Sequence, residues 1–165
     1  MADAALARLR EHPTETEELV RYFTSRDDVT MTQRAGMVLG WYGEEFPGRL
    51  APYFGELLEA ARAPIHSVVP RNVFRVFSLL SLTQIDERLE GPLLEVAFAR
   101  LTDPGQTVTV HVYCMQIVAT LTERYPELAG ELRDTLRDGL EESTPGYRSR
   151  AKKIIKQLEQ KYELN

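Results

Sequence analysis

The feature that most constrains the fold is a repeat with a period near 40 residues. In most segments apolar residues recur at i, i+3, i+4 and i+7, which is the spacing of one face of an amphipathic helix. When these segments are set beside each other, equivalent positions lie 39, 40 and 37 residues apart. Two aligned columns hold Ala35, Phe74, Cys114 and Ala151, and Val38, Phe77, Ile117 and Ile154. Because one helical hairpin cannot bury its apolar face alone, the repeat predicts hairpins that stack on their neighbours.

Proline and glycine divide the chain into helical segments of about 10–20 residues. We expect an all-α fold, a right-handed α-α superhelix of about four helical hairpins plus a C-terminal capping helix, in a single domain spanning residues 1–165. The hairpin units are placed at about 3–25, 31–62, 70–102 and 107–142, and the cap at 146–162. The expected helices are 3–11, 14–25, 31–46, 49–62, 70–84, 88–102, 107–125, 127–142 and 146–162.

The segment TVTVHVYC (residues 107–114) conflicts with its place in this scheme. Val108, Val110 and Val112 alternate with polar residues, a pattern typical of a β-strand. The repeat register nevertheless places Cys114 in a helical column. We therefore predict a helix here, with a strand as the alternative.

The helices differ in how much of their surface is apolar. The segment 70–84 is apolar nearly all round, which predicts burial between two neighbouring hairpins. Gly36, Gly40 and Gly43 lie in the helix 31–46, although glycine costs roughly 0.5–1 kcal/mol at each helix-interior position. We expect these glycines to let the preceding hairpin pack closely against this helix. The alternative is a shallow groove beside Trp41, an aromatic residue of a type enriched at binding hot spots.

The charge of the chain is unevenly distributed. The net charge is −5, but residues 1–145 carry 14 arginines, no lysine and 23 acidic residues, whereas 146–165 carry six basic and two acidic residues. The acidic body disfavours nucleic-acid binding, because phosphate binding needs clustered positive charge. The basic helix 146–162 follows a helix with six acidic residues, 127–142, so we expect its charges to be balanced within the fold.

The C-terminal helix also carries a resemblance to a known family. In GYRSRAKKIIKQL (residues 146–158), Arg148, Ala151 and Ile154 stand where HEAT repeats place an arginine, an alanine and an apolar residue. The chain resembles HEAT-like helical repeat proteins over nearly its whole length in periodicity. The resemblance implies a solenoid whose second helices line a concave face used for binding. Some alkylpurine DNA glycosylases share this architecture, which keeps nucleic-acid processing as an alternative.

The cysteine and histidine residues, which could take part in catalysis or bind metal, are better explained by packing. Cys114 shares a column with core residues, which predicts a buried thiol rather than a reactive one. The three histidines, His12, His66 and His111, have no metal-ligand spacing. No arrangement of carboxylates, no Ser–His–Asp order and no phosphate loop is evident. We therefore expect no catalytic residue, no cofactor, no metal and no enzymatic activity.

The sequence instead favours a non-catalytic scaffold that binds another protein or peptide on its concave helical face. The predicted partner-binding residues are Trp41, Arg49, Glu56, Arg88, Glu95, Arg133 and Arg137. Self-association through the ends of the stack is a further alternative, and the oligomeric state is left open. Apolar runs too short to span a membrane and a single cysteine favour a cytoplasmic protein.

Overall fold

A computed structural model describes residues 1–165 and contains helices but no strands, which confirms the all-α prediction. The chain forms two compact units, residues 1–80 and 81–165. The first unit contains α1 (Ala2–Glu11), η1 (Pro13–Glu15), α2 (Thr16–Thr24), α3 (Val29–Glu45), α4 (Pro47–Leu50), η2 (Ala51–Tyr53), α5 (Phe54–Arg62) and α6 (Val68–Ser78). The second contains η3 (Leu82–Gln84), α7 (Glu87–Leu101), α8 (Val108–Leu121), α9 (Leu128–Asp138) and α10 (Pro145–Tyr162). The single domain and the right-handed superhelix stay predictions.

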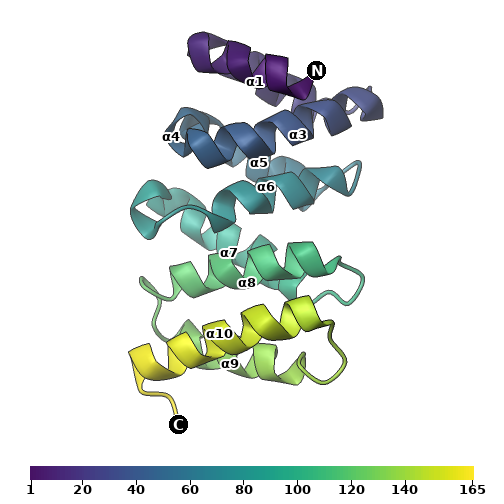
Figure 1. Ribbon diagram of the computed structural model, residues 1–165. Coiled ribbons are helices and arrows are strands. Elements are labelled where there is room, and N and C mark those ends of the chain that lie inside the picture. The colour runs from purple at the N-terminus through teal and green to yellow at the C-terminus, as the bar shows by residue number, and fades with distance from the viewer. The chain divides into compact units, whose positions relative to one another are not determined.

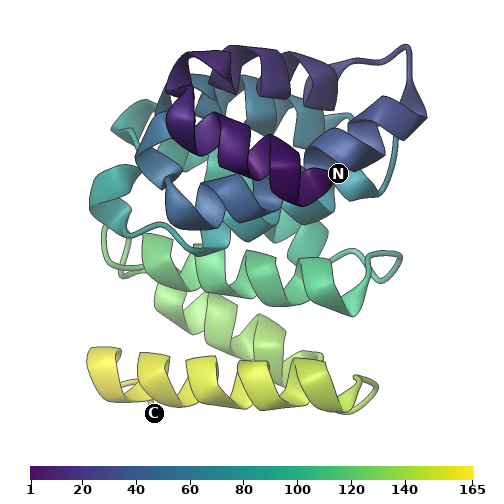
Figure 2. The ribbon, with the colours of Figure 1, turned by 45° about the horizontal axis from the view of Figure 1, so that its top comes forward.

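Helix α3 is the centre of the first unit. It packs against α1, α2 and α6, while α5 packs against α2 and α6. Figure 1 shows α3 between α1 and α6, and Figure 2 gives a second view of the same layers. The largest fully buried side chains of this unit include Phe23, Tyr42 and Phe74. The Tyr42 hydroxyl lies 2.8 Å from Thr16 Oγ1, so the polar end of this buried ring has a partner.

Helix α8 has the corresponding place in the second unit. It packs against α7, α9 and α10, and α9 also packs against α10 (Figure 1). One carboxylate lies inside this unit: Glu90 on α7 is 1% exposed. It accepts a 3.0 Å hydrogen bond from the Tyr125 hydroxyl and lies 3.5 Å from Arg124. The hydrogen bond to Glu90 raises the pKa of Tyr125, because it stabilises the protonated phenol.

The aligned columns are confirmed as core positions. Ala35, Phe74, Cys114 and Ala151 are all buried, and so are the four members of the next column. Equivalent positions face inwards because successive helices present the same stripe to their neighbours. The repeat in the sequence therefore arises from the packing of successive helices.

The prediction for residues 70–84 is wrong at its C-terminal end, because α6 ends at Ser78. The Ser78 hydroxyl donates to the Arg75 carbonyl. Ser81 and Gln84 form a capping box that starts the short helix η3. Leu79, expected to be buried between neighbours, is 53% exposed. Local capping therefore overrides the apolar pattern that continues beyond Ser78.

Residues 108–114 are helical, so the strand alternative is wrong. Thr107 caps α8, and its Oγ1 accepts a 3.4 Å hydrogen bond from the backbone N–H of Val110. Val110, Cys114 and Ile117 are all buried along one side of the helix. Burial at helical spacing outweighs the weak β preference of the valines.

The glycines of α3 allow a close helix–helix contact, but chiefly with α6 of the next hairpin rather than with the preceding hairpin. A Cβ on Gly40 would lie 2.8 Å from Asn72 Oδ1, and one on Gly43 would lie 2.6 Å from Val76 Cγ2. Both neighbours belong to α6. Gly36 alone also faces the preceding α2, where Phe23 would be 3.1 Å from its Cβ. The expected partner of the glycine row is corrected accordingly.

Candidate partner-binding surfaces

Three predicted binding residues belong to the first unit. Arg49 stacks its guanidinium over the Phe46 ring at 3.9 Å and donates to the Leu9 carbonyl at 3.4 Å. Glu56 is exposed on α5 and accepts a 3.0 Å hydrogen bond from Thr24 Oγ1. Trp41 is half-buried on α3. Arg49 thus has a structural role at the turn between α3 and α5.

The four predicted residues of the second unit are largely engaged within it. Arg88 donates to Asp86 at the start of α7, and these bonds lower the pKa of Asp86 to about 2. Arg133 pairs with its neighbour Asp134 at 2.8 Å and donates to the Asn165 carbonyl. Arg137 pairs with Glu159, and Glu95 is exposed on α7. The role of all seven residues in binding stays a prediction.

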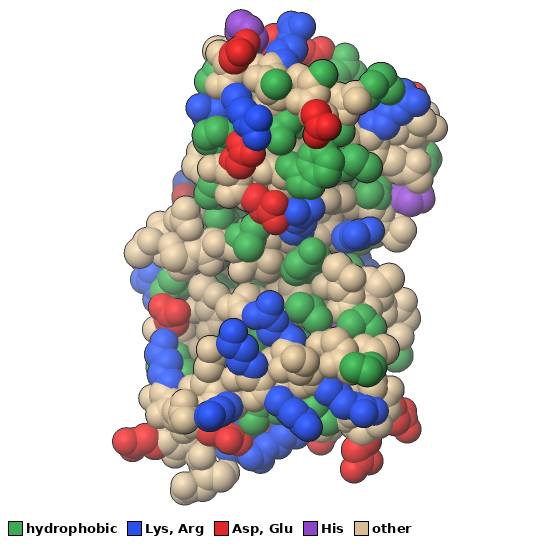
Figure 3. All heavy atoms as spheres, in the orientation of Figure 1, with side chains coloured by type: hydrophobic (Ala, Val, Ile, Leu, Met, Phe, Trp, Pro, Cys, Tyr) green, Lys and Arg blue, Asp and Glu red, His purple; other side chains and the backbone are tan.

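An apolar groove crosses the first unit over α1, α2 and α3, a feature that our sequence reasoning missed. We call it the α1–α3 groove, and its volume is about 550 Å³. Figure 3 shows hydrophobic side chains gathered over α1 and α3. Tyr22 and Met37 are 39% and 51% exposed at its edges. The lining side chains with large apolar parts are Met1, Leu9, Leu19, Tyr22, Met31, Met37 and Val38.

Some charged residues at the edge of this groove have ion-pair or hydrogen-bond partners, and one has none. Arg8 pairs with Glu15 at 2.6 Å, and the Tyr22 hydroxyl donates to Glu18 at 2.9 Å. Arg34 lines the groove, is exposed, and has no ion-pair or hydrogen-bond partner in the structure. The groove therefore combines an apolar surface with an unpaired arginine. A sequence signal for it existed, because Met37 is apolar yet lies outside the buried stripe of α3.

A second surface lies between the exposed sides of α8 and α10, and we call it the α8–α10 groove. Two separate hollows, of about 480 and 560 Å³, lie along this surface and share no lining residue. The α8 wall is neutral and carries Thr109, Tyr113, Gln116 and Thr120, which share one helical face. The α10 wall carries Arg150, Lys153, Gln157, Gln160 and Lys161. Figure 3 shows lysine and arginine side chains along α10.

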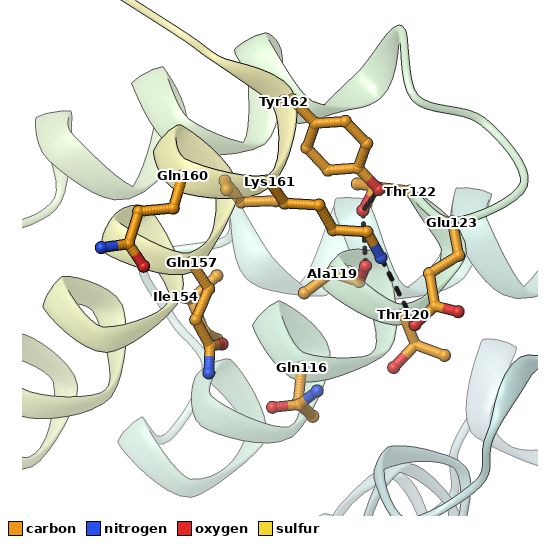
Figure 4. A pocket seen from close by; sticks show the side chains of 11 residues that line it. Gln116, Ala119, Thr120, Thr122, Glu123, Ile154, Gln157, Gln160, Lys161 and Tyr162 are labelled. Carbon is orange, nitrogen blue, oxygen red and sulfur yellow. Dashed lines mark hydrogen bonds and ion pairs between the residues drawn. The ribbon is translucent and has the colours of Figure 1, made fainter.

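At one end of the α8–α10 groove, two side-chain contacts join α10 to the residues that follow α8 (Figure 4). The Tyr162 hydroxyl donates to Thr122 Oγ1 at 2.9 Å. Lys161 extends towards Glu123, with its Nζ 4.0 Å from the carboxylate. Glu123 is the only carboxylate that lines either hollow. The rest of the groove is neutral or positively charged.

The expected charge balance between α9 and α10 is wrong in its main part. The ion pair between these helices runs from Arg137 on α9 to Glu159 on α10, opposite to the expected direction. Arg148 donates to the carbonyls of Leu140 and Glu141. Four further cations of α10 have no ion-pair or hydrogen-bond partner in the structure: Arg150, Lys152, Lys153 and Lys156. The acidic side chains of α9 do not reach them.

The two residues considered for redox or metal chemistry have packing roles. His111 Nε2 lies 2.8 Å from the Asp103 carbonyl, so this nitrogen carries the proton and donates. The His111 ring also meets Tyr147 edge-on, with 6.0 Å between ring centroids. Cys114 is fully buried in α8. Burial raises the pKa of the Cys114 thiol to about 12.

We predict that Cys114 does not react in the folded protein. With a pKa of about 12, about one thiol in ten thousand is ionised at pH 8, and alkylation requires the thiolate. Iodoacetamide should therefore label native protein at least about 100-fold more slowly than protein in urea. Between pH 7 and 9 the rate should stay negligible in the native state and rise steeply in urea. Rapid native labelling, followed by mass spectrometry, would contradict this.

Comparison with known proteins gives a match to one family model. No helix is long and apolar enough to cross a membrane. No curated protein and no solved structure matches the chain. A family model described as a HEAT repeat domain matches residues 2–158. Since that match covers nearly the whole chain and agrees with its all-helical fold, the protein belongs to the HEAT repeat family.

Proposed function

We propose that this protein is a non-catalytic module that binds another protein through the α1–α3 groove. HEAT repeats generally mediate protein–protein interaction or scaffolding, and the family is typically non-enzymatic. The observation that carries the proposal is the clustering of exposed apolar side chains. Of the five large apolar side chains exposed on the chain, Met1, Tyr22 and Met37 border this one groove.

The chemistry of the groove defines the partner. Exposed apolar patches on folded proteins mark interaction sites, and methionine adapts its shape to different ligands. The unpaired Arg34 adds a preference for a carboxylate beside the apolar contact. We therefore propose a partner segment that inserts apolar side chains and carries an acidic residue opposite Arg34.

Met37→Lys should remove this interaction without unfolding the chain. It places a charge where the partner's apolar side chain would lie, and lysine is as good a helix former as methionine. We expect the affinity for the partner to fall by more than about tenfold, because the complex would bury a charge that has no partner. Native protein used as bait in a lysate should recover a partner, and isothermal titration with the purified partner should then give the affinities.

Leu79→Lys is the matched control, because Leu79 is 53% exposed and does not line the groove. The proposal requires that wild type and Leu79→Lys capture the same protein and that Met37→Lys loses it. Equal capture by all three, with circular dichroism showing equal folding, would exclude the α1–α3 groove as the binding surface.

The surface first predicted from the sequence is the alternative site for a protein partner. It would use the second helices through Arg49, Glu56, Arg88, Glu95, Arg133 and Arg137, and Trp41 on α3 is a further predicted binding residue. Glu56, Arg88, Glu95 and Arg137 are the exposed charged side chains that favour it. If Trp41→Ala lowers the melting temperature but leaves binding unchanged, Trp41 belongs to the core. Self-association and a cytoplasmic location stay predictions.

A further inference from the structure

We propose that the α8–α10 groove binds a short acidic segment of a partner protein, with the segment's carboxylates against Arg150 and Lys153. This inference rests on the proposed protein-binding function but uses a different surface from the α1–α3 groove. The two proposals can therefore fail separately.

Two cations of α10 line the groove without a partner of opposite charge. Arg150 and Lys153 are three positions apart, so they project from the same side of the helix. Both line the hollow of about 560 Å³, and neither has an ion-pair or hydrogen-bond partner in the structure. No carboxylate of the chain lines that hollow. A ligand with negative charge would supply the missing partners.

The α8 wall, opposite these cations, carries polar side chains without charge. The four polar residues of α8, from Thr109 to Thr120, offer hydroxyl and amide groups without charge. Gln116 on α8 and Gln157 on α10 can each donate and accept hydrogen bonds. Such side chains suit the N–H and C=O groups of a peptide backbone. At about 1.5 Å per residue, the row is roughly 16 Å long, which accommodates about five residues of extended chain.

The composition of the groove favours a protein segment over nucleic acid. Its floor contains apolar side chains, among them Val112, Ile154 and Leu158. A segment that mixes acidic and apolar residues matches this surface, whereas a nucleic-acid strand presents a regular row of phosphates. Residues 1–145 carry 14 basic and 23 acidic residues, so the rest of the chain disfavours a long polyanion.

Fluorescence anisotropy with a labelled acidic peptide tests the proposal. The probe is a peptide of about eight residues with about five glutamates and a central leucine, titrated at low ionic strength. Replacing Arg150→Gln and Lys153→Gln together should weaken binding about tenfold, since two charge contacts are lost. Replacing Lys152→Gln and Lys156→Gln together removes the same charge from α10 but from residues outside the groove. This control pair should weaken binding less than about threefold.

Three outcomes of this titration would contradict the proposal. An equal loss in the two double variants would show a diffuse charge effect, and absence of binding by the wild type would exclude the site. Tighter binding of a single-stranded oligonucleotide of similar charge would assign the surface to nucleic acid instead. Met37→Lys should bind the acidic peptide like the wild type. Loss of partner capture by that variant therefore reports only on the α1–α3 groove.

Discussion

Replacing Gly43 with leucine is expected to lower the free energy of unfolding by about 3 kcal/mol or more. Gly43 is buried where α3 crosses α6. Even a Cβ there would lie 2.6 Å from Val76 Cγ2 and 3.0 Å from Leu50 Cδ1. Val76 and Leu50 are buried, and the β-branched Val76 has little rotamer freedom. A leucine must therefore push α3 and α6 apart.

Leucine has a higher helix propensity than glycine, and this difference acts against the destabilisation caused by overpacking. Leucine in place of glycine favours a helix by up to about 1 kcal/mol, which is smaller than the cost of overpacking. Gly130→Leu separates the two effects, because Gly130 lies on α9 and no other part of the fold lies within 4 Å of a Cβ there. Urea denaturation followed by circular dichroism should show Gly130→Leu as stable as the wild type or slightly more stable. If Gly43→Leu behaves in the same way, the close contact of α3 with α6 is wrong.

Phe77→Ala should also destabilise the chain strongly, by about 3–5 kcal/mol. Phe77 is 1% exposed on α6 and packs against Phe54 of α5, with 5.1 Å between ring centroids. Alanine would leave a cavity and remove the aromatic pair, because the surrounding helices can close only part of the space. For a chain of this size, the melting temperature should fall by about 10 °C.

Leu79→Ala is the control for Phe77→Ala. Leu79 lies two residues further along the chain but is 53% exposed, so its truncation should cost less than about 0.5 kcal/mol. Calorimetry of both variants gives the comparison. Similar small shifts for the two would mean that Phe77 is not a core residue.

The fold was largely predictable from the sequence because packing repeats along the chain. Ala35, Phe74, Cys114 and Ala151 are buried at equivalent places, and each of the nine predicted helical segments contains a helix. The end of α6 was missed because its apolar pattern continues through Leu79 and Leu80. There a hydrogen bond from Ser78 and a capping box at Ser81 determine the end of the helix.

The candidate surfaces were harder to predict, because they depend on which side chains find partners across helices. The sequence places an acidic helix before a basic one, yet Arg150 and Lys153 face α8 rather than α9. Arg49 resembles a free surface charge in the sequence but stacks on Phe46. The α1–α3 groove brings together residues from three helices, which periodicity within one helix does not reveal.

The most direct test of the proposed function is hydrogen exchange of the whole chain with and without the partner recovered by capture. We predict slower exchange in α1, α2 and the part of α3 up to Val38, since these elements line the α1–α3 groove. Binding of an acidic segment of the same partner would add protection in α8 and α10. Protection confined to α5, α7 and α9, with α1–α3 unchanged, would contradict the proposal and assign binding to the second helices.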